Sequence, residues 1–472
     1  MVSSIQNFSW ESKKLGVMYF RVALILFGAQ LLMGLIAAIQ YMYPSFLFEI
    51  FDFSVARMVH INALVVWMLY AMIGAVYYMM PDETGIETVG IGLAKLGFWV
   101  LTAAVTVVVL VYIIVQVGPA NQMTIWLINE GREYIEAPRW ADIGIVVVVL
   151  LFIFNVYATA IKGERTDIMT VMMANLLALA GLYLAGMGYT DSISMDQYWW
   201  WWVIHLWVEA TWEVFVATLA AWALIQIIGA SRKIVEMWLW IEVAMLFGSG
   251  ILGLGHHYFW IGTPEYWWEI GALFSALEPV PLIAMFVHVI YDWGKQTGKN
   301  GEKNTLANTP AFVWIVSNGF GNFLGAGVWG FFHTLPQVNI YTHGTQFTSS
   351  HGHLAFWGAY ATILIAMFYM GIQGSHKIKV MKMTFNAKMG FGLLWLGMMG
   401  MVIALLISGY GQVLVERAQW GATWDGFFLS QDSKWFVEGL AWRLAMGAVM
   451  LVGFVYLVID LLSIGKSDRH ER

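Results

Sequence analysis

The sequence predicts an all-α integral membrane protein with twelve transmembrane helices. Hydrophobic residues make up 60% of the 472 residues and charged residues only 11%, whereas soluble domains carry about 25% charged residues. The 26 tryptophans and 28 methionines support this prediction, because tryptophan gathers at membrane interfaces and methionine fills irregular apolar gaps. Apolar runs of about 20 residues recur along the whole chain, and each is long enough to cross a bilayer.

No connection between these runs is long enough to hold a separate domain, so residues 1–472 are expected to form a single membrane domain with its helices between about 17 and 464. No cleavable signal is apparent, and the first run is expected to remain a helix. The predicted spans are Val17–Tyr41, Val55–Met80, Ile91–Val117, Ile143–Ile161, Ile168–Met187, Tyr198–Ile228, Ile234–Ile261, Trp267–Tyr291, Ala311–Phe332, His351–Ile372, Phe385–Gly411 and Trp435–Ile464.

The distribution of lysine and arginine predicts the orientation of the chain. If both termini are cytoplasmic, most lysines and arginines in the loops between the predicted spans lie on the inner side, as the positive-inside rule requires. The modest net charge of -6 and the lack of a basic block give no indication of nucleic-acid binding. The absence of cysteine excludes disulfides, cysteine-bound metals and covalent haem.

Six histidines are predicted to lie at one depth, in the outer third of the membrane. Four of these histidines lie near the start of spans that run from outside to inside, and two lie near the end of a span that runs outward. Histidines with a purely structural role would have no reason to share one depth. These residues are His60, His205, His256, His257, His351 and His353.

Two of the six are separated by a single residue. On a helix, His353 is turned roughly 200° from His351, so the two rings leave opposite faces and cannot satisfy each other. A buried unpaired histidine is costly in a membrane. Each imidazole is therefore expected to bind a separate group, and a planar iron macrocycle with an axial imidazole suits each.

The sixth span offers metal ligands and further carboxylates. His205, Glu209 and Glu213 follow at i, i+4 and i+8, which places them on one helical face. With His256 and His257 at the same depth, three imidazoles would suit copper or zinc. The carboxylate of Glu209 shifts the preference towards non-haem iron. The alternative interpretation of the two carboxylates is a satisfied hydrogen-bond network.

Other polar residues have both a functional and a purely structural interpretation. Glu278, about a dozen residues into the eighth span, can donate protons or can be a neutral group that shapes a cavity. Arg57 and His343 can bind haem propionates or can be ordinary interfacial and loop residues. Glu133 can bind a hard cation or be solvated in its outer loop.

The arrangement resembles the catalytic subunit of the haem-copper oxidase superfamily. Three segments look like the large subunit of the cytochrome-c-dependent nitric oxide reductases: residues 205–213 with the pattern His-Leu-Trp-Val-Glu-x-x-x-Glu, residues 255–262 with Gly-His-His-Tyr-Phe-Trp-Ile-Gly, and residues 341–346 with Tyr-Thr-His-Gly-Thr-Gln. The resemblance runs from about Tyr19 to Trp442 and weakens after the eleventh span.

The resemblance assigns roles to individual residues. It implies that His60 and His353 bind a low-spin haem b and that His351 is the proximal ligand of a high-spin haem b3. It further implies that His205, Glu209, His256 and His257 hold a non-haem iron. Glu213 and Glu278 match carboxylates that support proton delivery in the family, and Glu133 matches a calcium ligand near the haem propionates.

The implied function is nitric oxide reduction in denitrification, a form of respiratory electron transport. Two NO molecules would be reduced to N2O and water with two electrons and two protons. Without a covalent haem site or an added hydrophilic N-terminal domain, the chain is expected to receive electrons from a membrane-anchored cytochrome c subunit. The apolar inner half of the sixth span favours proton uptake from the outer side. The expected location is the bacterial inner membrane, as a multi-pass protein surrounded by lipid.

Three other functions remain open at this stage. A terminal oxidase with copper in the second metal site would reduce O2 to water, but it would not need Glu209 beside His205. A non-enzymatic cytochrome b would need only His60 and His353. A transporter is supported by the number of helices alone.

Overall fold

The computed structural model describes residues 8–114, 126–127, 129–132, 134, 136–299, 306–419, 421 and 423–465. Within these residues the chain is helical, and twelve helical spans are long and apolar enough to cross a membrane. The predicted fold class is therefore confirmed. Several spans extend beyond the predicted limits, for example Glu11–Met42 in place of 17–41.

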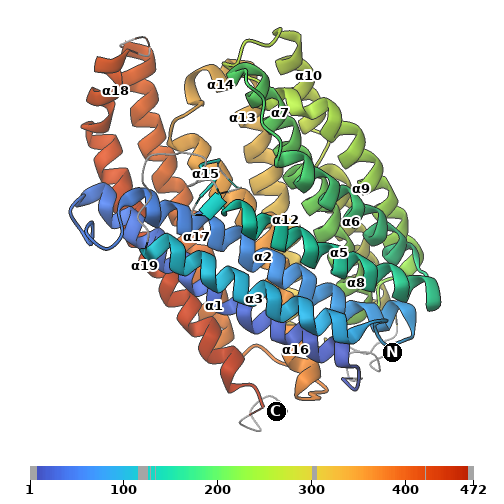
Figure 1. Cartoon of the computed structure of the whole chain (residues 1–472). Coiled ribbons are helices and arrows are strands. Elements are labelled where there is room, and N and C mark those ends of the chain that lie inside the picture. Colours follow the sequence, from blue (N-terminus) through green and yellow to red (C-terminus); the bar gives the residue numbers. More distant parts are fainter. Residues whose placement is uncertain are drawn as a thin grey trace. The chain divides into compact units, whose positions relative to one another are not determined.

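Neighbouring long helices lie side by side (Figure 1). Short π-helical and 3-10 segments, written η, interrupt several of them. The elements in chain order are α1 (Glu11–Met42), α2 (Phe53–Thr84), α3 (Ile91–Ile114), α5 (Arg139–Lys162), α6 (Asp167–Gly186), α7 (Ile193–His205), η1 (Leu206–Trp212), α8 (Glu213–Ile228), α9 (Arg232–Gly253), η2 (Leu254–His257), α10 (Tyr266–Ser275), α11 (Val280–Lys299), α12 (Thr309–Asn322), η3 (Phe323–Trp329), α13 (Gly330–Thr334), α14 (Pro336–Thr342), α15 (Gln346–Ala355), η4 (Phe356–Ala361), α16 (Thr362–Ser375), α17 (Phe385–Gln412), η5 (Val413–Gln419), α18 (Trp424–Gln431) and α19 (Lys434–Ser463).

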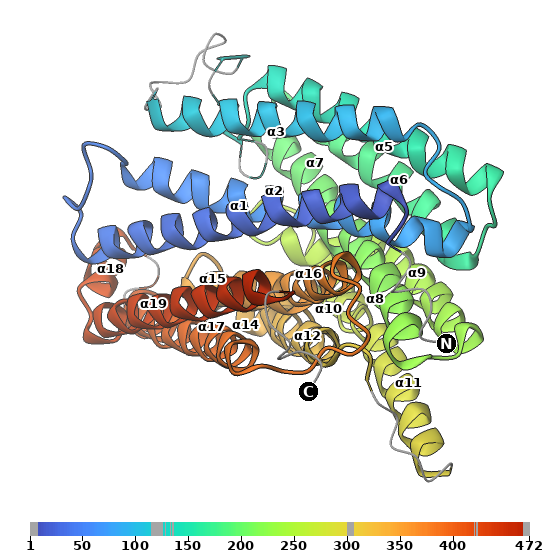
Figure 2. The same ribbon diagram turned by 90° about the horizontal axis from the view of Figure 1, so that it is seen from below.

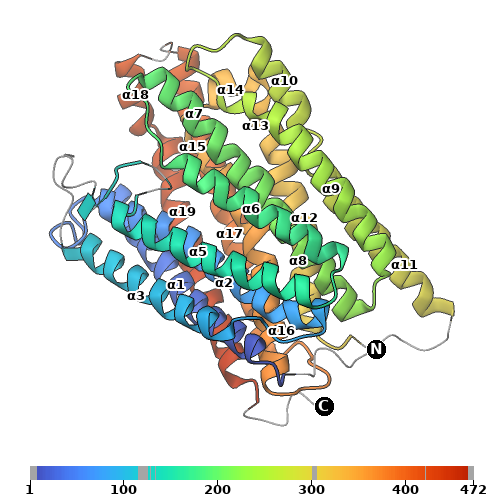
Figure 3. The ribbon, with the colours of Figure 1, turned by 45° about the vertical axis from the view of Figure 1, so that its right-hand side comes forward.

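The chain divides into two compact units. One, among the residues that the structure describes, lies in 8–188 and 370–377, and in it α1 packs along α2 and α3 along α5 (Figure 2). The other, within the described residues, lies in 189–369 and 378–465, and in it α17 packs along α19 and α9 contacts both α8 and α11 (Figure 3). That all residues form one membrane domain stays a prediction.

Side-chain caps and glycines set the limits of several helices. Asp52 accepts a hydrogen bond from the backbone N–H of Val55 at the start of α2, and Thr384 accepts one from Ala387 at the start of α17. Such caps satisfy amide groups that lack a partner in the first turn. Gly229 ends α8 with φ of 64°, a conformation that glycine adopts without steric cost. Local sequence thus fixes where the long apolar segments start and stop.

Candidate metal centre

The first part of the centre is built where α7 passes into the π-helix η1. His205 is the last residue of α7 and Glu209 lies within η1. His205 Nδ1 lies 3.1 Å from Glu209 Oε2. The sequence predicted a regular helix with these residues on one face. A π-helical turn carries an extra residue per turn, and such turns are frequent at functional sites.

The second part comes from the end of α9. There the helix tightens into the 3-10 segment η2, whose last two residues are His256 and His257. Both adjacent imidazoles approach Glu209: His256 Nε2 lies 3.4 Å from Oε2 and His257 Nε2 lies 3.1 Å from Oε1. The tighter winding of the 3-10 turn changes the angle between the two side chains from that of an α-helix.

The structure brings these four predicted residues together, and their ligand atoms all lie within 4.8 Å of one another. His205 is buried, and its Nδ1 makes no hydrogen bond within the described part of the chain. Three imidazole nitrogens and one carboxylate around a common point match the ligands of a transition metal. The arrangement therefore fits a metal ion.

Neighbouring groups orient the imidazoles. His205 Nε2 donates a hydrogen bond of 2.8 Å to the carbonyl oxygen of Gly250, which leaves Nδ1 as the ligand atom. His256 Nδ1 and the hydroxyl of Ser275 are hydrogen-bonded. The ring of Trp201 stacks on His257 with centroids 4.7 Å apart and planes 7° apart. Sequence reasoning gave none of Gly250, Ser275 and Trp201 a supporting role, because such contacts carry no spacing signal.

His351 lies in the same compact unit, on α15. Its Nδ1 donates a hydrogen bond of 3.2 Å to the carbonyl oxygen of Gly325 in η3, so Nε2 is the nitrogen suited to an axial haem bond. It interacts electrostatically with Glu209 and His257. A Cβ atom at Gly330 would lie 3.0 Å from the ring, so glycine there leaves the imidazole its space.

Two further predicted carboxylates are buried close to the cluster. Glu213 begins α8 and is 5% exposed, and Glu278 lies in the turn between α10 and α11 and is 7% exposed. Both interact electrostatically with Glu209 and with each other. Oε1 of Glu278 has no hydrogen-bond partner among the described residues. These positions suit groups that exchange protons near the metal ligands.

Tyr360 is a site residue that sequence reasoning missed. It lies in η4, and its hydroxyl donates a hydrogen bond of 3.1 Å to the carbonyl oxygen of Val208 in η1. The phenol also interacts electrostatically with Glu209, Glu213 and Glu278. Its place in the sequence could have indicated a role at the site, because Tyr360 follows His351 on the same span, about two and a half helical turns further along.

The two histidines predicted for the low-spin haem lie in different compact units and are described separately. His60 Nδ1 donates a hydrogen bond of 2.8 Å to the carbonyl oxygen of Gln30, whose side chain accepts one from Trp67. His353 Nδ1 donates one of 2.7 Å to the carbonyl oxygen of Ser349. Both bonds select the tautomer in which Nε2 is unprotonated, the form that binds iron.

Three residues were predicted to bind haem propionates or calcium near the outer surface, and the structure describes two of them. Arg57 is exposed on α2. His343 follows the last residue of α14, and its carbonyl oxygen accepts a hydrogen bond of 3.0 Å from Arg417. Burial, with His257 and Arg417 nearby, lowers the pKa of His343. Glu133, the predicted calcium ligand, lies outside the described residues.

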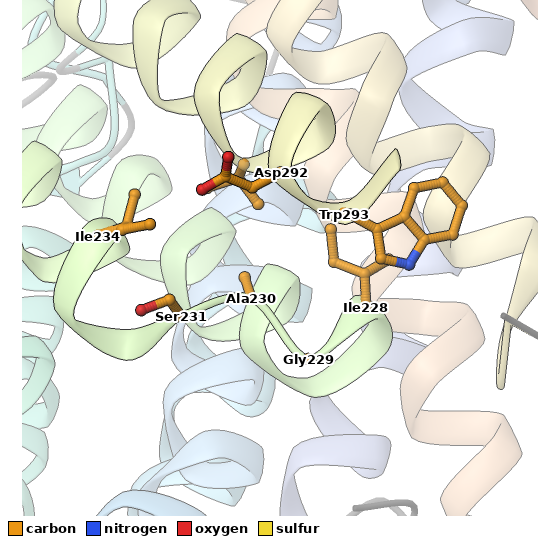
Figure 4. Close-up of a pocket in the computed structure, with 8 residues that line it drawn as sticks. Ile228, Gly229, Ala230, Ser231, Ile234, Asp292 and Trp293 are labelled. Atoms are coloured by element: carbon orange, nitrogen blue, oxygen red, sulfur yellow. The ribbon is translucent and has the colours of Figure 1, made fainter. Parts of the chain in front are cut away.

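A small surface pocket lies away from these residues, where α8, α9 and α11 meet (Figure 4). Asp292 and Ser231 are among its polar lining residues, and Trp293 closes one side. None of the four clustered ligands lines it. The chemistry of the chain is therefore expected at the buried cluster and not at this pocket.

Comparisons with known proteins show the family to which the chain belongs. Residues 14–458 match the family described as Cytochrome C and Quinol oxidase polypeptide I. The chain is 38% identical to a nitric oxide reductase subunit of Stutzerimonas stutzeri, over 99% of this chain and 98% of that protein. A cryo-EM structure of a haem-copper terminal oxidase dimer has a TM-score of 0.66 at 16% identity, covering 97% of this chain and 84% of the other. That likeness shows the shared fold.

Proposed function

Since the chain belongs to the cytochrome c and quinol oxidase polypeptide I family, we propose that it is the catalytic subunit of a nitric oxide reductase. The reaction joins two NO molecules through a new N–N bond. It breaks one N–O bond, consumes two electrons and two protons, and releases N2O and water. The full-length similarity to a protein named as a nitric oxide reductase subunit supports this reaction.

The single observation that carries the proposal is the position of Glu209. Its two carboxylate oxygens lie 3.1 to 3.4 Å from nitrogen atoms of three histidines. Three imidazoles alone would suit copper, whereas an added anionic oxygen ligand favours iron. We therefore assign a non-haem iron to His205, Glu209, His256 and His257.

The haem assignments rest on the family and on the tautomers described above. His351 is the proposed proximal ligand of a high-spin haem b3, and His60 and His353 are the proposed axial ligands of a low-spin haem b. When bound, the haem and the non-haem iron would bind NO and pass to it the electrons that arrive from outside the chain. Holding both NO molecules in one pocket makes the coupling effectively intramolecular.

The chain's own residues supply protons and geometry. Glu213 and Glu278 are buried beside the cluster and are the proposed proton donors for the oxygen atom that leaves as water. Ser275 and the carbonyl of Gly250 hold His256 and His205 in position. The electrons come from outside the chain, and we propose a membrane-anchored cytochrome c subunit as their source.

Further assignments complete the proposal. The chain is a multi-pass membrane protein, and we place the reaction in the outer third of the bacterial inner membrane, on the basis of the positive-inside rule. Arg57 and His343 are proposed propionate partners, and Glu133 is a proposed calcium ligand. Each of these three residues can be tested by substitution without changing the predicted iron ligands.

The decisive experiment measures iron, copper and haem in the purified protein together with N2O formation from NO. We expect one iron beyond the two haems, no copper, and N2O as the product. Glu209→Ala should lose the extra iron and the activity but keep the low-spin haem spectrum. Glu269→Ala, a change of an exposed glutamate on α10, is the matched control. Stoichiometric copper, or a protein that does not reduce NO, would overturn the proposal.

A further inference from the structure

One more buried carboxylate lies in the same compact unit, on a helix that sequence reasoning used only for its terminal histidines. Glu242 is in the middle of α9 and is 2% exposed. The buried side of α9 is otherwise formed by small or apolar residues with one serine: Val235, Leu239, Leu246, Ser249, Gly250 and Gly253. Their spacing of three or four residues is that of one helical face. A glutamate therefore occupies a position where a leucine would pack.

The carboxyl group of Glu242 is not satisfied by its surroundings. Neither oxygen has a hydrogen-bond partner among the described residues. The backbone of Leu282, at the start of α11, is the polar group that approaches it. Burying an unpaired carboxyl group is costly. A buried ionisable residue in a membrane helix is a candidate for function, because a leucine would fill the position without that cost.

Glu242 is linked electrostatically to the two carboxylates already placed beside the metal ligands. It interacts electrostatically with Glu213 on α8 and with Glu278 before α11. Among the described glutamates of this compact unit, Glu278 is the other one that is buried with an unpartnered oxygen. Mutual repulsion between buried carboxyl groups favours states in which protons are shared among them.

Other polar groups near α9 do not neutralise Glu242. Trp238, one turn before it, donates its indole N–H to His288 Nδ1 at 3.1 Å. His288 Nε2 lies 3.5 Å from Asp292 Oδ2. These three groups are therefore engaged with one another, and the described ion pairs do not include Glu242.

From this arrangement we propose that Glu242 is a proton-storing residue that acts through Glu213 and Glu278. It transfers a proton to whichever of the two has given its own proton to the reaction, and it is then reprotonated by water. No electrons move in this step, and one O–H bond is broken for each one formed. The inference rests on the proposed function and extends it, because each turnover consumes two protons in a buried site.

The test compares variants of the full enzyme with its electron-donor subunit. The reduced enzyme is mixed with NO, and haem oxidation and proton uptake are followed by absorbance and a pH-indicator dye. Glu242→Gln should keep the haem spectra and iron content but slow proton uptake about tenfold or more, and Glu242→Asp should recover part of the rate. A structural role alone would not slow proton uptake while leaving these spectra unchanged.

A matched control is available in the same unit. Asp460 is also a buried carboxylate within a membrane-spanning helix, but it accepts hydrogen bonds from Tyr369 and Thr384. Asp460→Asn should therefore leave proton uptake unchanged. If Glu242→Gln takes up protons as fast as the wild type, the inference is overturned. If the wild type does not reduce NO, the proposed function itself fails, so the two failures are distinguishable.

Infrared difference spectroscopy gives a second measurement that does not need turnover. Reduced-minus-oxidised spectra should contain a carbonyl-stretch band of a protonated carboxylic acid that is lost in Glu242→Leu and shifted in Glu242→Asp. Glu242→Leu should also raise the thermal stability, because it removes the unpaired carboxyl group. Spectra identical to the wild type in both variants would contradict a change in the protonation of Glu242.

Discussion

The hydroxyl of Tyr360 donates a hydrogen bond of 3.1 Å to the carbonyl oxygen of Val208. Val208 lies in the π-helix η1, one residue before Glu209. In a π-helix the backbone bonds span five residues instead of four, so individual carbonyl groups become available to side chains. The phenol therefore stabilises the turn that directs Glu209 towards the histidines.

The Tyr360→Phe variant tests this support. It removes only the hydroxyl and leaves the buried carbonyl of Val208 without this partner, which costs roughly 1–3 kcal/mol. We expect a lower iron content and a loss of activity of about tenfold, measured by metal analysis and N2O formation. Tyr341→Phe, at an exposed position, is the control and should behave as the wild type. Full iron and full activity in Tyr360→Phe would show that η1 does not need this bond.

The hydrogen bond between His256 and Ser275 gives a second prediction. Partners behind a metal ligand typically contribute about 10–100-fold to metal affinity or activity. Ser275→Ala should therefore lose iron faster than the wild type during dialysis against a chelator, while the haem spectra stay unchanged. Ser317→Ala removes a hydroxyl that bonds to its own helix, at Trp314, and should retain iron normally. Equal rates of iron loss would refute a supporting role for Ser275.

Close backbone packing between α12 and η4 predicts a stability effect. A Cβ atom at Gly358 would overlap the backbone oxygen of Gly321, and backbone atoms cannot move aside as side chains can. Gly358→Ala should lower the free energy of unfolding by about 1–3 kcal/mol or prevent assembly. Gly392→Ala, with nothing within 4 Å of its added Cβ atom, should be neutral or slightly stabilising. The stability of both variants is measured as the midpoint temperature at which the haem absorbance is lost on heating. Equal midpoint temperatures for Gly358→Ala and Gly392→Ala would contradict the prediction.

The pH dependence of stability reports on His343. Burial lowers the pKa of this imidazole, so below its ordinary pKa of about 6.5 the unfolded chain binds a proton that the folded chain does not. Stability from this group is present above that pH and is lost as the pH falls towards the lowered pKa. His343→Asn should therefore reduce the difference in unfolding temperature between pH about 7.5 and about 5.5. An unchanged difference would show that folding does not lower the pKa of His343.

The amino-acid sequence alone was enough to predict which segments cross the membrane and which side chains are available for chemistry. Apolar runs must satisfy their backbone groups internally in lipid, so length and composition were enough to predict twelve helices. Buried histidines and carboxylates are costly in a membrane, which made His205, Glu209, His256 and His257 identifiable without a structure.

How those residues meet depends on the packing of the helices. A regular helix was expected through His205 and Glu209, but the π-helix η1 and the 3-10 turn η2 change their directions and bring all four ligands to one point. Such departures depend on packing against other helices and have no simple sequence period. The same holds for Ser275, Tyr360 and Glu242, whose neighbours come from distant parts of the chain. Sequence patterns report which face of a helix is buried, whereas the contacts between buried faces arise only when the helices pack together.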